Sequence, residues 1–135
     1  MFPIKTIMTK DVYTVKESTP IFEALQLLKK YEVSGLPVVD EEMNLKGILT
    51  EKDVLRILID SDSHYRAQVR DFMTRDVVAF KEDDSAFEVC QFFLNSHIRR
   101  VPICEGKKLV GIVSRRDIIT LIVEAKSKIS DARFT

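Results

Sequence analysis

The sequence has few of the residues that mark several common protein classes. Its 135 residues include no tryptophan, two cysteines, four glycines and four prolines, and 21 basic and 21 acidic side chains cancel to a net charge of zero. A balanced charge excludes the broad positive field that would hold nucleic acid or an anionic membrane. No apolar run approaches the roughly 18 residues of a membrane span, and the first residues lack the layout of a signal peptide. We therefore expect a cytoplasmic protein without a nucleic-acid or membrane partner.

Residues suited to catalysis or metal binding are also sparse. The two histidines and two cysteines stand at unrelated spacings, so we expect no metal site. Cys90 and Cys104 lie among apolar neighbours, where a reduced thiol is the expected state. No glycine-rich phosphate loop, nucleophile elbow or zinc-protease motif is present. We therefore predict no catalytic residue and a protein that is not an enzyme.

The sequence does contain an internal repeat. MTKDV at 8–12 returns as MTRDV at 73–77, and LKGILTEKD at 45–53 returns as LVGIVSRRD at 109–117. Each copy is only about 60 residues long, which is small for an independently stable unit. The two repeats are therefore expected to share a core.

Each repeat shows the same succession of hydrophobic patterns. A short β-prone segment precedes an amphipathic helix, and two buried strands then precede a closing helix. The expected strands are 11–15, 36–39 and 46–49 in the first repeat, and 76–80, 101–104 and 108–113 in the second. The pattern predicts an α/β (α+β) fold of two β-α-β-β-α repeats. We place repeat 1 at 1–60, a linker at 61–68, repeat 2 at 69–127 and a C-terminal tail at 128–135.

The closing helices are apolar around most of their circumference. Their apolar residues are Val54, Leu55, Ile57, Leu58 and Ile59 in the first repeat, and Ile118, Ile119, Leu121, Ile122 and Val123 in the second. One sheet covers only one side of a helix, so another surface must cover the rest. A second chain would do so in a homodimer, which we expect. The alternative is that both sides are covered within one chain.

A repeated motif joins the last strand of each repeat to its closing helix. It reads Thr50–Asp53 in the first repeat and Ser114–Asp117 in the second. A hydroxyl followed three residues later by an acid resembles a capping box. Because aspartate is shorter than glutamate, we expect it to reach the N-cap amide poorly and to leave its carboxylate free. A free carboxylate accepts hydrogen bonds, and a ribose diol donates two. Helix capping and nucleotide binding both remain open.

The complete series of motifs resembles a tandem pair of cystathionine-β-synthase-type (CBS) domains, also called a Bateman module. The resemblance rests on Met-Thr at the front, an aliphatic-Pro-aliphatic strand, and Gly-aliphatic-x-Thr/Ser-x-x-Asp at the end, in order and twice, from about residue 4 to 123. It implies that the repeats pack about a pseudo-twofold axis and leave two clefts. It also implies that each cleft takes an adenosine ligand such as AMP, ADP, ATP or S-adenosylmethionine.

The resemblance assigns residues from both repeats to each cleft. The first cleft would use Thr14, Ser34, Gly35, Leu36, Pro37, Ser114, Arg116 and Asp117. The second would use Thr50, Lys52, Asp53, Ala79, Phe80, Arg99, Arg100, Val101 and Pro102. Guanidinium groups suit phosphate oxygens, so Arg99 and Arg100 predict that the second cleft prefers the more phosphorylated ligand. The alternative is that both arginines are solvated surface charges.

Taken together, the motifs predict a regulatory nucleotide-sensing module that acts on an unidentified effector protein. The alternative function is a ligand-free dimerisation or protein-interaction module. The two aspartates distinguish these hypotheses, because an interaction module has no use for an unpaired carboxylate.

Overall fold

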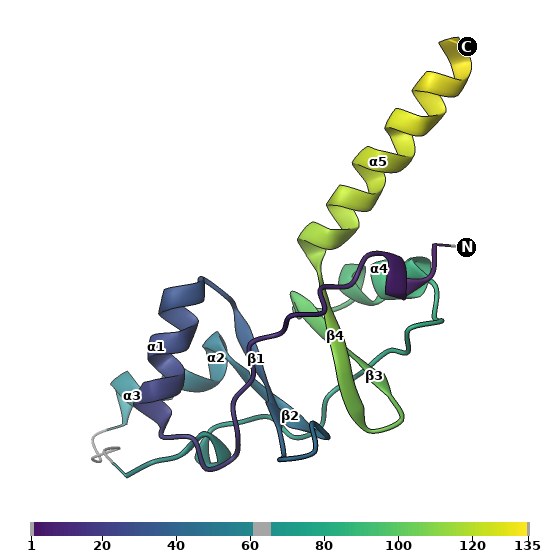
Figure 1. Ribbon diagram of the computed structural model, residues 1–135. Coiled ribbons are helices and arrows are strands. Elements are labelled where there is room, and N and C mark those ends of the chain that lie inside the picture. The colour runs from purple at the N-terminus through teal and green to yellow at the C-terminus, as the bar shows by residue number, and fades with distance from the viewer. Residues whose placement is uncertain (1, 61–65, 135) are drawn as a thin grey trace.

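The computed structural model describes residues 2–60 and 66–134, and its elements follow the repeated order (Figure 1). The first repeat contains η1 (Ile4–Thr6), α1 (Ile21–Tyr31), β1 (Gly35–Val39), β2 (Leu45–Thr50), α2 (Glu51–Val54) and α3 (Arg56–Ile59). The second contains η2 (Val69–Asp71), α4 (Ala86–Leu94), β3 (Arg100–Glu105), β4 (Lys108–Ser114) and α5 (Arg115–Phe134). Residues 61–65 of the expected linker lie outside the described residues.

Each repeat is built on one antiparallel hairpin, β1–β2 or β3–β4, as the sequence predicts. The expected first strands at 11–15 and 76–80 do not form. Each of these segments makes a single parallel bridge, between Val15 and Val38 and between Phe80 and Ile103. The prolines at the centres of β1 and β3 explain this difference. The next rung of either ladder would need a backbone N–H at Pro37 or Pro102, which proline lacks.

The closing helices also differ from the expectation. In the first repeat the helix is interrupted at Leu55, so α2 and α3 are single turns. In the second repeat α5 continues to Phe134, so residues 128–134 of the expected C-terminal tail are helical. No glycine or proline occurs in α5, so nothing in its sequence stops the helix. Figure 1 shows α5 extending away from the rest of the molecule.

The two repeats exchange their leading segments. Ile4, at the start of the chain, is fully buried in the core of the second repeat with Val89, Val101 and Val113. In return, Val69 of η2 is fully buried in the core of the first repeat. In Figure 1 the purple N-terminal segment accordingly runs beside α4 and β4. Each core is therefore completed by the other repeat.

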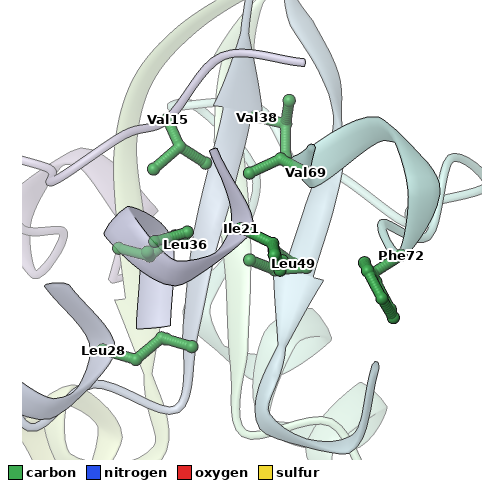
Figure 2. Close-up of a cluster of buried hydrophobic side chains, with 9 residues drawn as sticks. Val15, Ile21, Leu28, Leu36, Val38, Leu49, Val69 and Phe72 are labelled. Atoms are coloured by element: carbon green, nitrogen blue, oxygen red, sulfur yellow. The ribbon is translucent and has the colours of Figure 1, made fainter. Parts of the chain in front are cut away.

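Figure 2 shows the first core, which lies between α1, the β1–β2 hairpin and the η2 segment. Its buried residues are Val15, Ile21, Ala24, Leu28, Leu36, Val38, Leu49, Val69 and Phe72. A smaller cluster joins the two hairpins and includes Val39, Cys104 and Leu109. The apolar stripe of α1 thus covers its own hairpin, while the hairpins contact each other.

The contacts between the repeats come in equivalent pairs. The bridge between Thr9 and Ile112 corresponds to the bridge between Thr74 and Ile48, because the two threonines and the two isoleucines occupy matching repeat positions. The same exchange relates the bridge of Pro3 with Ser85 to that of Gln68 with Pro20. Exchanging the two repeats turns each of these bridges into its counterpart, which is the property of two units related by a twofold axis.

The repeated glycine of the last strand is required by this arrangement. A Cβ atom added to Gly47 would lie 2.4 Å from the Thr74 carbonyl oxygen and 2.5 Å from the Met73 Cε. A Cβ on Gly111 would lie 2.8 Å from the Met8 Sδ. Each glycine therefore makes room for the Met-Thr segment of the other repeat, which explains why both motifs recur together.

Candidate functional site

A cleft lies between the two repeats, at the start of β1 and the end of β4. It encloses about 120 Å³. Its lining residues are Thr9, Asp11, Val12, Tyr13, Val33, Gly35, Leu36, Pro37, Arg100, Ile112, Ser114 and Asp117. We call it the Asp117 cleft. Because both repeats contribute to its walls, anything bound in it contacts both.

The Thr/Ser-x-x-Asp motifs form complete capping boxes at the starts of α2 and α5. The Ser114 backbone N–H donates to Oδ2 of Asp117 at 2.8 Å, and the Asp117 N–H donates to the Ser114 Oγ at 3.3 Å. In the first repeat the Thr50 N–H donates to Oδ2 of Asp53 at 2.9 Å. The expectation that aspartate reaches this amide poorly was therefore wrong. Thr50 is extended, with φ −107° and ψ 164°, and this conformation turns its N–H toward the first helical turn.

The second carboxylate oxygen distinguishes the two motifs. Oδ1 of Asp53 accepts a hydrogen bond from the Thr74 Oγ at 3.1 Å, so both of its oxygens are occupied. Among the residues that the structure describes, Oδ1 of Asp117 has no hydrogen-bond partner. Thr9, the repeat equivalent of Thr74, lines the cleft without making that bond. Asp117, which lines the cleft, thus combines a capping role with a carboxylate oxygen that accepts no hydrogen bond from the described residues.

Arg100 lines the Asp117 cleft, whereas the resemblance assigns it to the second cleft. It begins β3 directly opposite Ser114, and its Nε donates to the Ser34 Oγ at 3.1 Å. Partial burial lowers the pKa of the Arg100 guanidinium, and the negative charges of Asp117 and Glu51 oppose that decrease. The side chain is long enough to cross from its own hairpin to the loop before β1, which explains the different assignment.

The other predicted residues divide into two groups. Gly35, Leu36 and Pro37 are buried in β1 and line the Asp117 cleft together with Ser114, whereas Thr14, Ser34 and Arg116 are not among its lining residues. Around the second motif, Lys52, Ala79 and Arg99 are exposed, and Val101 and Pro102 are buried within β3. The Phe80 ring makes an edge contact with Phe92, with centroids 5.8 Å apart.

Several residues of the Asp117 cleft were not predicted. They are Thr9, Asp11, Val12, Tyr13, Val33 and Ile112. Thr9, Asp11 and Val12 belong to the Met-Thr-x-Asp-Val motif, which recurs in the second repeat together with the Thr/Ser-x-x-Asp motif. This joint recurrence could have indicated that the two motifs lie at the same site. Tyr13 gave no such signal, since its repeat equivalent is Val78.

Neither a metal-binding cluster nor a membrane-spanning helix is found among the described residues. They contain no group of three or more histidine, cysteine or acidic side chains that could hold a metal ion. None of the helices in the same part of the chain combines the length and apolar character that a bilayer span requires.

Sequence comparisons match most of the chain. A family model for the CBS domain matches residues 4–60 and 69–124. An inosine-5'-monophosphate dehydrogenase from Methanocaldococcus jannaschii is 38% identical over 114 residues, covering 84% of this chain and 22% of the enzyme. The uncharacterized protein YlbB from Bacillus subtilis is 34% identical over 119 residues, covering 87% of this chain and 80% of that protein. The chain thus spans under a quarter of the dehydrogenase but most of YlbB.

Two of the solved structures with the same architecture were determined with adenosine ligands. CBSX2 from Arabidopsis thaliana, crystallised with AMP, is 27% identical with a TM-score of 0.83 over 93% of this chain and 99% of that chain. The CBS domain pair of protein MJ0100, in complex with 5'-methylthioadenosine and S-adenosylmethionine, is 29% identical with a TM-score of 0.80, and the match covers 93% of this chain and 98% of that chain. The repeated motifs, the exchanged cores and these matches together show that the chain belongs to the CBS domain family, as a tandem pair of CBS domains.

Proposed function

We propose that this protein is a regulatory module that binds an adenosine ligand in the Asp117 cleft, without catalysis, and acts on a separate effector protein. The ligand class is that of AMP, ADP, ATP or S-adenosylmethionine. The AMP complex of CBSX2 and the S-adenosylmethionine complex of MJ0100 support this class by similarity. The proposal includes the ligand-binding roles that the family resemblance assigns to residues of the two clefts.

One observation carries the proposal most directly. Asp117 lines a cleft to which both repeats contribute, and its carboxylate is anchored through Oδ2 while Oδ1 accepts no hydrogen bond from the described residues. A fixed carboxylate with a free acceptor oxygen suits a neutral donor such as a ribose hydroxyl. The second oxygen of Asp53, by contrast, already accepts a hydrogen bond from Thr74, which leaves it less acceptor capacity for a ligand. We therefore propose that the Asp117 cleft binds the ligand more tightly than the second cleft.

Arg100 connects this cleft to the relation between the repeats. The cleft volume of about 120 Å³ is below the roughly 300–1,000 Å³ of typical ligand sites. Because Arg100 both lines the cleft and donates to Ser34, a bound nucleotide would displace it and break that hydrogen bond. The freed guanidinium would meet the ligand's phosphate. Ligand binding would thus replace the direct hydrogen bond between Arg100 and Ser34 with a contact made through the ligand. Such a change in how the repeats contact each other could be passed on to an effector protein.

The test compares two matched aspartate variants by titration calorimetry with AMP, ATP and S-adenosylmethionine. Asp117→Asn should lose about 2 kcal/mol of binding, or about thirtyfold in affinity, because a charge-assisted hydrogen bond is lost. Asp53→Asn perturbs the equivalent capping box and controls for helix stability. Equal affinities in both variants and the wild type would limit Asp117 to helix capping. A wild-type protein that binds none of these ligands would refute the proposed function.

We also propose that the protein is a homodimer. Several large apolar side chains on the closing helices are exposed in the single chain: Leu55 67%, Leu58 90%, Ile59 82%, Ile119 58%, Ile122 58% and Val123 62%. Burying such a surface against a second copy would be favourable. These exposed residues equally suit the alternative function, a ligand-free interaction module. Light scattering tests the dimer, and a mass near the 15.5 kDa of one chain would contradict it.

A cytoplasmic location belongs to the proposal as well. Cys90 and Cys104 are both free thiols, and Cys104 is buried. Reduced cysteines are typical of compartments kept reducing by cellular thiols. Fractionation of cells that express the tagged protein tests this location.

A further inference from the structure

A pair of stacked tyrosines stands beside the Asp117 cleft. The rings of Tyr13 and Tyr31 are nearly parallel, with an interplanar angle of 12° and centroids 3.7 Å apart. Tyr13 lies in the extended segment before Val15, and Tyr31 is the last residue of α1. The Lys30 ammonium lies 5.3 Å from the centroid of the Tyr31 ring. The pair therefore joins the cleft wall to the end of α1.

The stack holds the Tyr13 ring in place while leaving part of it uncovered. Tyr13 lines the cleft, and 49% of its surface is exposed. In the part of the chain that the structure describes, its ring contacts no aromatic ring except that of Tyr31. An aromatic ring fixed by a neighbour and half exposed in a cleft is preorganised for a second planar group, because its conformational entropy is already lost.

The pair is confined to one of the two repeats. The positions equivalent to Tyr13 and Tyr31 in the second repeat hold Val78 and Ser96. Both repeats fold in the same way, so the fold itself does not require the stacked rings. The pair occurs beside the aspartate that keeps a free oxygen and is missing beside Asp53, whose oxygens are both occupied. Two independent features thus distinguish the same cleft.

We propose that Tyr13 is a specificity-determining residue that stacks on the planar base of the ligand in the Asp117 cleft, supported from behind by Tyr31. The inference rests on the proposed function and adds to it the residue that recognises the base. A ring of this kind contributes little to binding a sugar phosphate that has no base, because stacking requires a second flat π surface.

Tyrosine fluorescence reports on this contact directly, because the sequence contains no tryptophan. The chain has three tyrosines, and a Tyr65→Phe background leaves emission only from Tyr13 and Tyr31. In that background AMP should quench the emission with saturation, while ribose 5-phosphate should not. Free N-acetyltyrosinamide, titrated in parallel, corrects for light absorbed by AMP.

Affinity measurements on three variants complete the test. Tyr13→Val introduces the residue type of the second repeat and should weaken AMP binding about tenfold, within the range of base–aromatic stacking. Ribose 5-phosphate should bind this variant and the wild type equally. Tyr13→Phe keeps the ring face and should keep AMP affinity, while Val78→Ala controls for a substitution at the equivalent position.

The outcomes separate this inference from the proposed function. Tight AMP binding by the wild type, loss in Asp117→Asn and no change in Tyr13→Val would overturn the role of Tyr13 and leave the proposed function standing. Equal losses of AMP and ribose 5-phosphate in Tyr13→Val would also overturn it, because the ring would then act on cleft structure. A wild type that binds no adenosine ligand would overturn both.

Discussion

Substitution of Gly47 by alanine tests whether the contact between repeats requires glycine. The added Cβ would lie 2.4 Å from the Thr74 carbonyl oxygen, a backbone atom that cannot rotate away as a side chain can. The same carbonyl accepts from the Ile48 N–H at 2.8 Å, and the Thr74 N–H donates to the Ile48 carbonyl at 2.9 Å. Relieving the clash therefore requires the strand and the crossing segment to separate.

The expected cost of Gly47→Ala follows from these contacts. Overpacking costs about 1–3 kcal/mol, and each weakened backbone hydrogen bond adds about 1 kcal/mol. We expect a loss of about 3–5 kcal/mol in the free energy of unfolding. For a chain of this size that corresponds to a decrease in Tm on the order of 10 °C.

Denaturant unfolding followed by circular dichroism measures this loss, with two variants for comparison. Gly106→Ala has no atom within 4 Å of the added Cβ but has a φ of +61°, so its cost should be only about 1 kcal/mol. Gly47→Ala combined with Met73→Ala removes the side-chain clash at Met73 and keeps the backbone clash, so it should recover little stability. A cost below about 1 kcal/mol for Gly47→Ala would refute the reasoning.

Three further predictions concern the core, the cleft and a buried thiol. Ile4→Ala should cost about 2–5 kcal/mol and leave a single calorimetric transition, since Ile4 is fully buried in the second core; two separate transitions would contradict the shared core. Arg100→Ala should lower ATP affinity more than AMP affinity, and the difference should shrink with salt because it is partly electrostatic; equal losses in calorimetry would argue against phosphate recognition. Burial raises the pKa of the Cys104 thiol above its usual value of 9.0. The unfolded chain therefore loses this proton first as pH rises, and stability should fall above about pH 9. Cys104→Val should weaken that fall in denaturant unfolding, and identical pH profiles would count against it.

The sequence predicts the hairpins and the first helix of each repeat because their apolar patterns are local. The hydrophobic pattern alone does not predict that Val15 and Phe80 each make only one bridge. The length of this pairing depends on β1 and β3, where Pro37 and Pro102 lack the N–H that a further hydrogen bond would need. Local propensity alone favours the extension of α5, since its 20 residues contain neither glycine nor proline.

The candidate site was predictable in its motif but not in its connections. The aspartates were identified from their repetition, yet the hydrogen bond from Thr74 to Asp53 joins residues from different repeats. The position of Arg100 depends on the conformation of a long side chain, and that conformation is selected by Ser34 across the cleft. Contacts of this kind depend on tertiary packing, which the spacing of residues within one repeat does not describe.

The exchange of leading segments also has a consequence for how the chain is synthesised. Ile4 leaves the ribosome about a hundred residues before the strands that bury it, β3 (Arg100–Glu105) and β4 (Lys108–Ser114). The first hairpin likewise waits for Val69 before its core is complete. Neither core is therefore complete until residues of the other repeat have been made, and the segment that contains Ile4 stays uncovered until β3 and β4 have emerged. Such long-range contacts slow folding and expose nascent chains to aggregation, so this architecture is most vulnerable while the first repeat has been made and the second has not.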